Sequence, residues 1–367
     1  MLFYVLIFVF LLLSIVFAKF KRECTSVVFS FWILFFALIT ALRDGVGTDY
    51  EAYVYIFGLT PTLDELFSTL PVIDIGFWWF NSIIKTFTGS VVVMFFFSSF
   101  ITTMLFFVVC KKILPSHVMV SLLIFYSFFL LRFEFNTIRH GMMVMWVWLG
   151  FCYVPLKDYR FFLFVIIGGL FHVVGFLFLP FYWLLNWRIS NIGMFFIILL
   201  SYMIGFYLPI FQFLQFFVSA NSVLGSKFQF YTEEYYALEA SSSIGITLGM
   251  IIYLFLLLFF SIQMKKMRDN IYALLLRNSL FIALCMAFLL NKYGVFVERL
   301  SSLLYVSIAF IVPMIIQYLF RDASHKLLAY SILVLYCFLL LERNVLSVES
   351  STGELQYVPY KMIKCFM

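Results

Sequence analysis

Long apolar runs separated by short polar segments recur along the chain from its first residue to residue 341. In lipid, a helix of about 20 apolar residues crosses the hydrocarbon core, so runs of this kind indicate membrane spans. Twelve runs can be bounded, at residues 2–18, 26–42, 91–110, 117–131, 140–154, 161–171, 173–187, 192–216, 244–263, 272–290, 301–319 and 326–341. The pattern predicts an all-α, polytopic integral membrane protein of about twelve transmembrane helices, forming a single membrane domain over residues 1–367.

Composition agrees with a lipid environment. Apolar residues make up 65% of the chain and charged residues only 11%, whereas soluble domains carry about 25% charged residues. The net charge of +6 comes from bases scattered at the ends of the apolar runs, so we expect membrane lipid and no nucleic acid as a partner. The six cysteines and four histidines show no metal-ligand spacing, so no metal and no cofactor are predicted.

The distribution of basic residues orients the chain. With the N-terminus outside, the even-numbered connections hold 13 Lys and Arg against 4 Asp and Glu, if Arg277 is counted inside its helix. The odd-numbered connections and the two ends then hold 10 basic and 14 acidic residues. Because basic residues are enriched in cytoplasmic connections, this bias predicts an outside N-terminus and a retained first span.

Two segments decide the parity of the spans that follow them. Residues 73–87 are apolar but contain Asn81 and Lys85, and we interpret them as an amphipathic helix on the outer surface. The run from residue 161 to 187 is long for one span, and counting it as one would place later basic connections outside. We therefore expect it to break near His172 into two short helices.

Three outer segments are longer than a turn requires, at residues 43–90, 217–243 and 342–367, the last being a C-terminal tail. Long polar and aromatic connections often carry function. The inner connections are short and basic, and the sequence has no GxxxxGK[ST] loop. An ATP-driven transporter or a soluble type of nucleotide-sugar enzyme is thus disfavoured, and the chemistry is expected at the outer face.

The first outer segment opens with the sequence RDGVGTDYEAY. Its two glycines, Gly45 and Gly47, permit a left-handed backbone path just after a helix. We expect this turn to present Arg43, Asp49 and Tyr53 side by side at the membrane surface. The alternative is a surface turn with a snorkelling arginine.

A second candidate lies in the sequence LRFEFNTIRHG. Arg132, Asn136 and Arg139 stand at positions i, i+4 and i+7, so they share one face if the stretch is helical, with His140 beside them. A guanidinium fork matches phosphate oxygens, which makes a lipid-linked diphosphate the natural counterpart.

Two further polar side chains are expected at the outer surface: His172, at the apex of the broken run, and Arg299, after a short connection. Each candidate has a plainer alternative. The arginines at 132 and 139 can form internal ion pairs, for instance with Glu134 or Asp49. His172 can be a structural histidine, and Arg299 a snorkelled helix end.

Five short motifs follow one another along the chain. They are R-x-x-x-G-x-D-x-x-x-Y at Arg43, Gly47, Asp49 and Tyr53, then Asn136-Thr137-Ile138-Arg139-His140-Gly141-Met142-Met143, then Phe171-His172-Val173-Val174, then Arg299 ahead of Pro313, and finally Pro359-Tyr360. In order and spacing they resemble the EpsG/Wzy-type family of bacterial O-antigen and exopolysaccharide polymerases over most of the chain. The sequence departs from that family at His140, where Gln is common, and at Met142 and Met143, where small residues are usual.

The resemblance implies a glycosyltransferase without a cofactor. It would move a growing polysaccharide from undecaprenyl diphosphate onto a lipid-linked repeat unit, at the periplasmic face of the bacterial inner membrane. Expected partners are undecaprenyl-diphosphate-linked oligosaccharides, a chain-length regulator and a repeat-unit flippase.

Roles follow for the candidate residues. Asp49 or His172 would take the proton of the attacking hydroxyl, and Arg139 would stabilise the leaving diphosphate. The predicted diphosphate ligands are Arg43, Arg132, Arg139 and Arg299. The predicted substrate contacts are Tyr50, Tyr53, Asn136, His140 and Tyr360.

Three other functions stay open at this stage. A different multi-span lipid-carrier glycosyltransferase would use a monophosphate-linked sugar and an acidic pair such as Asp44 and Asp49. A lipid-linked oligosaccharide flippase would be expected to show internal repeats and charges along the depth of the membrane. A membrane acyltransferase rests only on the histidines.

Overall fold

The computed structural model describes residues 1–207, 246–267, 269–291, 294–346 and 355–363. Within these ranges the regular structure is helical, apart from one isolated antiparallel bridge between Arg43 and Met362. The chain divides into two compact units, Met1–Leu184 with Ala309–Met367, and Leu185–Ile308. Each unit is described by itself.

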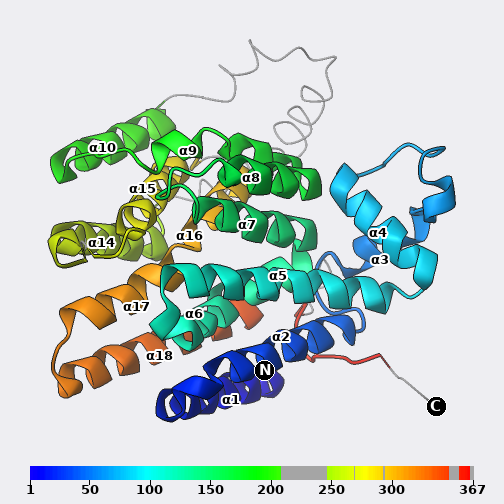
Figure 1. Ribbon diagram of the computed structural model, residues 1–367, viewed down its shortest axis with the longest axis horizontal. Helices are drawn as coiled ribbons and strands as arrows, with labels where there is room; N and C mark the ends of the chain where they lie inside the picture. Colours follow the sequence, from blue (N-terminus) through cyan, green and yellow to red (C-terminus); the bar gives the residue numbers. More distant parts are fainter. Residues whose placement is uncertain (208–245, 268, 292–293, 347–354, 364–367) are drawn as a thin grey trace. The chain divides into compact units, whose positions relative to one another are not determined.

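The first unit contains the helices of both chain ends (Figure 1). Its helices are α1 (Leu2–Phe20), α2 (Thr25–Ala41), α3 (Tyr50–Leu59), α4 (Ile75–Phe87), α5 (Val91–Ile113), α6 (Val118–Phe125), a π-helix (Tyr126–Asn136), α7 (Ile138–Phe151), α8 (Arg160–Phe171), α9 (Phe181–Leu184), α17 (Ile308–Leu319) and α18 (Ala323–Leu346). Helix α7 packs against α8 and α5, α5 packs against α2, and α18 packs against the π-helix.

The second unit is built around α15 (Ala273–Leu289), which contacts α10 (Asn191–Tyr207), α14 (Leu248–Gln263) and α16 (Gly294–Tyr305). Arg277 lies inside α15, as its place in an apolar run predicted. Its Nη1 donates to the Ile189 carbonyl at 3.1 Å, and Asn278 accepts from the same guanidinium. Because a buried cation needs partners, these contacts explain how an arginine is tolerated there.

Six of the described helical segments are long and apolar enough to cross a membrane. They are Leu2–Phe20, Val91–Ile113, Pro115–Asn136, Leu248–Met267, Arg299–Leu319 and Ala323–Leu346, and four shorter apolar helices accompany them. These segments coincide with the predicted apolar runs, so the all-α, multi-pass membrane class is confirmed. The total of twelve spans stays a prediction.

The predicted break near His172 is present. Helix α8 ends at Phe171, and His172 is extended, with φ −155° and ψ 122°. The chain then forms a 3-10 helix (Val173–Phe178) and the four-residue helix α9, so the second half of the run is not the regular helix we expected. A Cβ on Gly175 would lie 2.7 Å from the nitrogen of Gly169, which shows how closely the chain folds back on α8.

The first outer segment, residues 43–90, holds two helices. Helix α4 matches the predicted amphipathic helix at 73–87, although its place at the membrane surface stays a prediction. Helix α3 was not predicted. Rings from both helices join one buried cluster with α5 and the start of α7, in which Tyr53 and Phe77 lie 5.8 Å apart. This packing brings the first outer segment against residues 136–142, where the candidate site lies.

The other two outer segments are described only in part. Residues 217–243 lie outside the described residues. The start of the predicted tail, residues 342–346, is the last part of α18, and residues 355–363 lie beside the turn that follows α2.

Candidate functional site

The turn after α2 is held by the end of the chain. Its backbone hydrogen bonds are Ile363 N to Leu42 O at 2.8 Å, Asp44 N to Lys361 O at 3.0 Å and Gly47 N to Gln356 O at 3.2 Å. These bonds join residues more than 300 positions apart in the sequence, so the turn takes its shape from tertiary contacts as well as from its glycines.

Gly47 lets the turn approach the end of the π-helix. Its φ is +107°, a conformation that favours glycine, and a Cβ there would lie 2.8 Å from the Phe135 carbonyl oxygen. Asn136 Oδ1 accepts a hydrogen bond from Thr48 N at 2.9 Å, and Asn136 Nδ2 donates to the Tyr357 hydroxyl. The Asn136 amide therefore ties the turn to the C-terminal segment. Its predicted substrate contact stays a prediction.

Arg43 is fully buried. Its Nη1 donates to the Glu134 carbonyl oxygen at 3.1 Å, and its guanidinium carbon lies 4.5 Å from the ring centre of Phe95 and 4.8 Å from that of Phe135. Its Nε and Nη2 have no hydrogen-bond partner among the described residues. Burial lowers the pKa of Arg43 to about 10. The expectation that this turn presents Arg43 at the surface is therefore wrong, because aromatic rings and a carbonyl enclose the side chain.

The carboxylate of Glu134 is engaged by hydroxyls. Ser99 Oγ donates to one oxygen at 2.5 Å, and Thr103 Oγ1 donates to the other at 2.6 Å. Within the described residues Glu134 forms no ion pair with an arginine, although the Arg43 guanidinium bonds its backbone carbonyl. The internal pairing considered for the arginines thus does not involve the carboxylate of Glu134.

The stretch from Arg132 to Arg139 is not one regular helix. A π-helix ends at Asn136, both the nitrogen and the hydroxyl of Thr137 bond the Arg132 carbonyl, at 2.8 and 3.0 Å, and α7 begins at Ile138. The predicted shared face of Arg132, Asn136 and Arg139 depended on one regular helix with 3.6-residue spacing, and that condition is not met. π-Helical turns are rare and are often found at functional sites.

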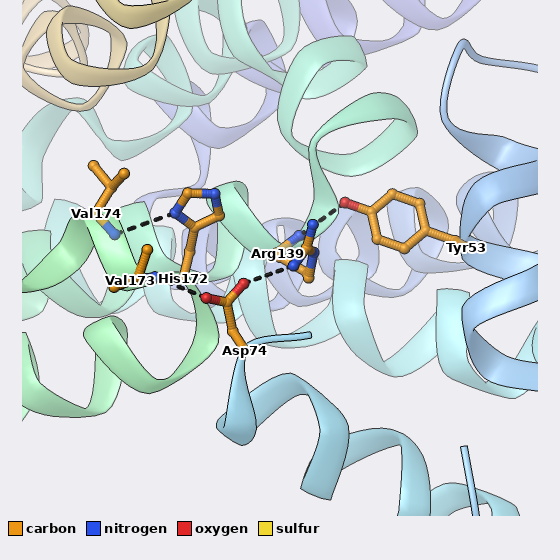
Figure 2. A network of polar contacts seen from close by, with 6 residues as sticks. All are labelled: Tyr53, Asp74, Arg139, His172, Val173 and Val174. Carbon is orange, nitrogen blue, oxygen red and sulfur yellow. Dashed lines mark hydrogen bonds and ion pairs between the residues drawn. The ribbon is translucent and has the colours of Figure 1, made fainter. Parts of the chain in front are cut away.

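Arg139 forms an ion pair with Asp74, and Figure 2 shows the carboxylate between the arginine and the start of the 3-10 helix after His172. Arg139 Nη1 lies 2.6 Å from Asp74 Oδ2, and the other carboxylate oxygen accepts the Val173 N–H at 3.1 Å. The two side chains remain 26% and 13% exposed. An internal ion pair, for instance with Glu134 or Asp49, was the plainer alternative for the arginines, and for Arg139 the acid is Asp74. The sequence offered one signal for Asp74, an acid directly before an amphipathic helix.

Tyr53 and His172 lie in the same cluster. The Arg139 backbone N–H donates to the Tyr53 hydroxyl at 3.4 Å, and burial raises the pKa of Tyr53. His172 Nδ1 accepts the Val174 N–H at 3.4 Å, so a neutral ring carries its proton on Nε2. His140 and His172, 32 positions apart in the sequence, have ring centres 5.5 Å apart. No group of three His, Cys, Asp or Glu able to hold a metal occurs within the described residues.

Two of the predicted substrate contacts, Tyr50 and Tyr360, pack against aromatic rings outside this cluster. Tyr50 stacks on Phe95 with ring centres 5.3 Å apart. Tyr360 stacks on Phe3 at 4.0 Å, and its hydroxyl donates to the Ile39 carbonyl at 2.5 Å. Their predicted substrate contacts stay predictions.

Three charged candidates also keep their predicted roles untested. Asp49 is the residue before α3, where its Oδ1 accepts from the Thr48 hydroxyl at 3.2 Å. Arg132 is partly exposed on the π-helix. Arg299 lies on α16 in the second unit.

A comparison with protein-family models matches the chain to the EpsG family over residues 26–362, which is nearly its whole length. Comparisons with curated proteins and with solved structures gave no significant match. The family match covers the turn after α2, the Arg139 and Asp74 pair, His172, Arg299 and Tyr360. It supports a polysaccharide-polymerase type of function in general. The chain, a multi-pass membrane protein, belongs to the EpsG family.

Proposed function

We propose that the protein transfers a growing polysaccharide from undecaprenyl diphosphate onto a lipid-linked repeat unit at the outer face of the bacterial inner membrane. The observation that carries the proposal is the cluster formed by Arg139, Asp74, Tyr53 and His172. These residues come from four separate segments of the first unit. A cation can stabilise the charge on a leaving diphosphate, and a carboxylate or a histidine can accept or donate a proton, so these groups side by side support glycosyl transfer from a diphosphate.

Arg139 is the proposed ligand of the diphosphate. Its side chain is 26% exposed, so an anion can reach part of the guanidinium. Its Nε is buried and has no hydrogen-bond partner among the described residues. A guanidinium binds phosphate oxygens through two parallel N–H bonds. As the glycosidic bond to the diphosphate breaks, the leaving group gains negative charge, which Arg139 stabilises more strongly than it stabilises the bound substrate.

His172 is proposed to act as a hydrogen-bond donor. Its Nδ1 already accepts the Val174 N–H, so the neutral ring presents an Nε2–H. An Nε2–H can donate a hydrogen bond to a phosphate oxygen of the carrier, whereas it cannot accept the proton of the acceptor sugar. In the transfer itself, the acceptor hydroxyl oxygen bonds to the anomeric carbon, its proton passes to a base, and undecaprenyl diphosphate leaves with the electron pair.

Arg43 is proposed to support the site indirectly. It is fully buried and bonds the carbonyl of Glu134 in the π-helix that leads to Arg139. Arg132 and Arg299 remain candidates for a second diphosphate. A chain-length regulator and a repeat-unit flippase are the proposed partners in the membrane.

The test is complementation of a deletion strain with Arg139→Ala at membrane levels matched to the wild type. Loss of the guanidinium is expected to abolish long chains, so that single repeat units remain on the surface polysaccharide gel. Arg160→Ala is the matched control, because Arg160 also pairs with an aspartate, Asp158 at 2.5 Å, but on an exposed part of the same unit.

Two results would contradict the proposal. Long chains that persist in the deletion strain would show that another protein polymerises the repeats. The absence of any repeat unit from the surface would point to a flippase or an earlier transferase.

A further inference from the structure

Asp74 has a position that the sequence-based roles do not use. Its two carboxylate oxygens have different partners: Oδ2 lies 2.6 Å from Arg139 Nη1, whereas Oδ1 accepts the Val173 N–H at 3.1 Å (Figure 2). One oxygen is thus bound to the backbone of the segment that follows His172, and the other is bound to the side chain of the proposed diphosphate ligand.

A bound anion can displace Asp74 from Arg139 more easily than from the Val173 N–H. The backbone N–H belongs to the turn after α8, which is fixed by the fold. The Arg139 contact is a charge-assisted bond between two partly exposed side chains, 26% and 13% exposed. A diphosphate carries more negative charge and more acceptor oxygens than one carboxylate, so it can compete for the guanidinium.

Displacement by the diphosphate frees one defined atom. When the carrier takes Arg139, Oδ2 of Asp74 loses its partner, while the Val173 N–H still holds Oδ1 and keeps the carboxylate in place. The free oxygen then lies next to the bound diphosphate, and therefore near the anomeric carbon to which the diphosphate is attached. A carboxylate without a cationic partner, beside an anion, accepts a proton more readily than an ion-paired one.

We infer that Asp74 is a further catalytic residue, the base that receives the proton of the attacking sugar hydroxyl once the diphosphate has displaced it from Arg139. The inference rests on the proposed function. In this step the hydroxyl oxygen forms the new bond to the anomeric carbon, its proton moves to Asp74 Oδ2, and the bond to the carrier breaks, leaving the electron pair on undecaprenyl diphosphate. The proton is later released to solvent.

Asp74 fits this role better than the two bases suggested by sequence. His172 Nδ1 accepts the Val174 N–H, which leaves a donor at Nε2. Asp49 stands at the N-cap position of α3 without a side-chain cap hydrogen bond, and its Oδ1 accepts from the Thr48 hydroxyl. Asp74 alone among the three forms an ion pair with Arg139 within the described residues. It thereby couples the arrival of the carrier to the availability of a base.

The test uses full-length protein in lipid vesicles, a lipid-linked repeat unit as substrate, and undecaprenyl diphosphate as the binding probe. Asp74→Asn keeps an oxygen for the Val173 N–H but cannot act as the base. We expect its turnover to fall by about 100-fold or more, within the usual range for loss of a general base. Its affinity for undecaprenyl diphosphate should stay equal or increase, because a competing anion is removed.

Two further variants keep the test decisive. Arg139→Ala is expected to lose affinity and turnover together, because it lacks the diphosphate ligand. Asp74→Glu retains a carboxylate and is expected to keep turnover at least about tenfold above that of Asp74→Asn, since general-base catalysis depends on the presence of the carboxylate.

Three results would overturn the inference. The first is an Asp74→Asn turnover close to that of the wild type. The second is a joint loss of turnover and affinity in that variant, which would mean that Asp74 only positions Arg139. The third is an Asp74→Glu variant as inactive as Asp74→Asn. If the wild type itself fails to elongate the repeat unit, the proposed function fails, and this outcome is separate from any result on Asp74.

Discussion

Arg43 is a buried arginine that supports the structure around the candidate site. A buried guanidinium needs compensation for lost hydration. Here it lies over the rings of Phe95 and Phe135, and one N–H donates to the Glu134 carbonyl. Cation–π contacts contribute about 0.5–2 kcal/mol each, depending on desolvation. The residue therefore links the end of α2 to the π-helix that leads to Arg139.

Gly47 and Gly45 provide a matched pair for a prediction at this scale. Both residues have positive φ, but their surroundings differ. A Cβ on Gly47 would lie 2.8 Å from the Phe135 carbonyl oxygen, whereas a Cβ on Gly45 would have no atom within 4 Å. We expect Gly45→Ala to cost about 1–2 kcal/mol, the usual penalty for a left-handed residue. Gly47→Ala should cost clearly more and reduce the folded yield, measured by thermal unfolding of the purified protein.

Gly58→Ala is the control for these glycines, because Gly58 lies within α3, has open space around it and has no positive φ. It should be neutral or slightly stabilising. Equal losses at Gly45 and Gly47 would show that contact with Phe135 is unimportant.

Among the elements, α4 combines an ordinary amphipathic pattern with a polar buried side. Phe77 and Ile84 join the aromatic cluster, whereas the buried polar side-chain atoms of Trp78, Asn81 and Ser82 have no hydrogen-bond partners among the described residues. Lys85 closes the same side by bonding the carbonyls of Phe57, Gly58 and Thr60. Buried polar atoms without partners cost free energy, so this helix is held less firmly than its burial suggests.

Asn81→Leu tests this description of α4. Replacing an unpaired buried amide by an apolar side chain of similar size should raise the free energy of unfolding by about 1 kcal/mol. Asn136→Leu is the control, because the Asn136 amide bonds both Thr48 and Tyr357 and its loss should destabilise the protein. Thermal unfolding of both variants provides the comparison. A loss at position 81 as large as that at 136 would show that the Asn81 amide is satisfied by water.

At the scale of the whole first unit, the two ends of the chain meet beside the candidate site. Tyr357 is buried, its carbonyl accepts from the Tyr4 hydroxyl at 3.0 Å, and its own hydroxyl accepts from Asn136. The first helix, the C-terminal segment and the end of the π-helix are thus joined at one residue. The C-terminal segment is therefore a structural part of this unit.

Two substitutions of Tyr357 distinguish what its ring and its hydroxyl each contribute to the free energy of unfolding. Tyr357→Phe should cost about 1 kcal/mol through the lost hydrogen bond, whereas Tyr357→Ala should cost about 3–5 kcal/mol through the cavity left by the ring. The free energy of unfolding and the amount of long-chain polysaccharide at the surface are both expected to decrease from the wild type to Tyr357→Phe and further to Tyr357→Ala. A stable and active Tyr357→Ala variant would refute the structural role of the C-terminal segment.

The sequence by itself determined the class of the protein, the position of most helices, the break at His172 and the helix at 73–87. These features follow from local patterns, because in lipid a chain must satisfy its own backbone hydrogen bonds and apolar length fixes where helices form. The family was also evident from the order of the motifs, since each motif depends on residue types at short spacing.

Only the tertiary structure decided which side chains meet. Asp74 pairs with Arg139 across 65 positions, and Asn136 reaches Tyr357 across 221. Arg43 is buried although its neighbours in the sequence suggest a surface turn, and the π-helix disrupts the face that regular spacing predicted. The physical reason is that partners for buried charges are chosen by the packing of distant helices. A pattern of spacing shows that a charge needs a partner, but it carries no information on which residue will supply it.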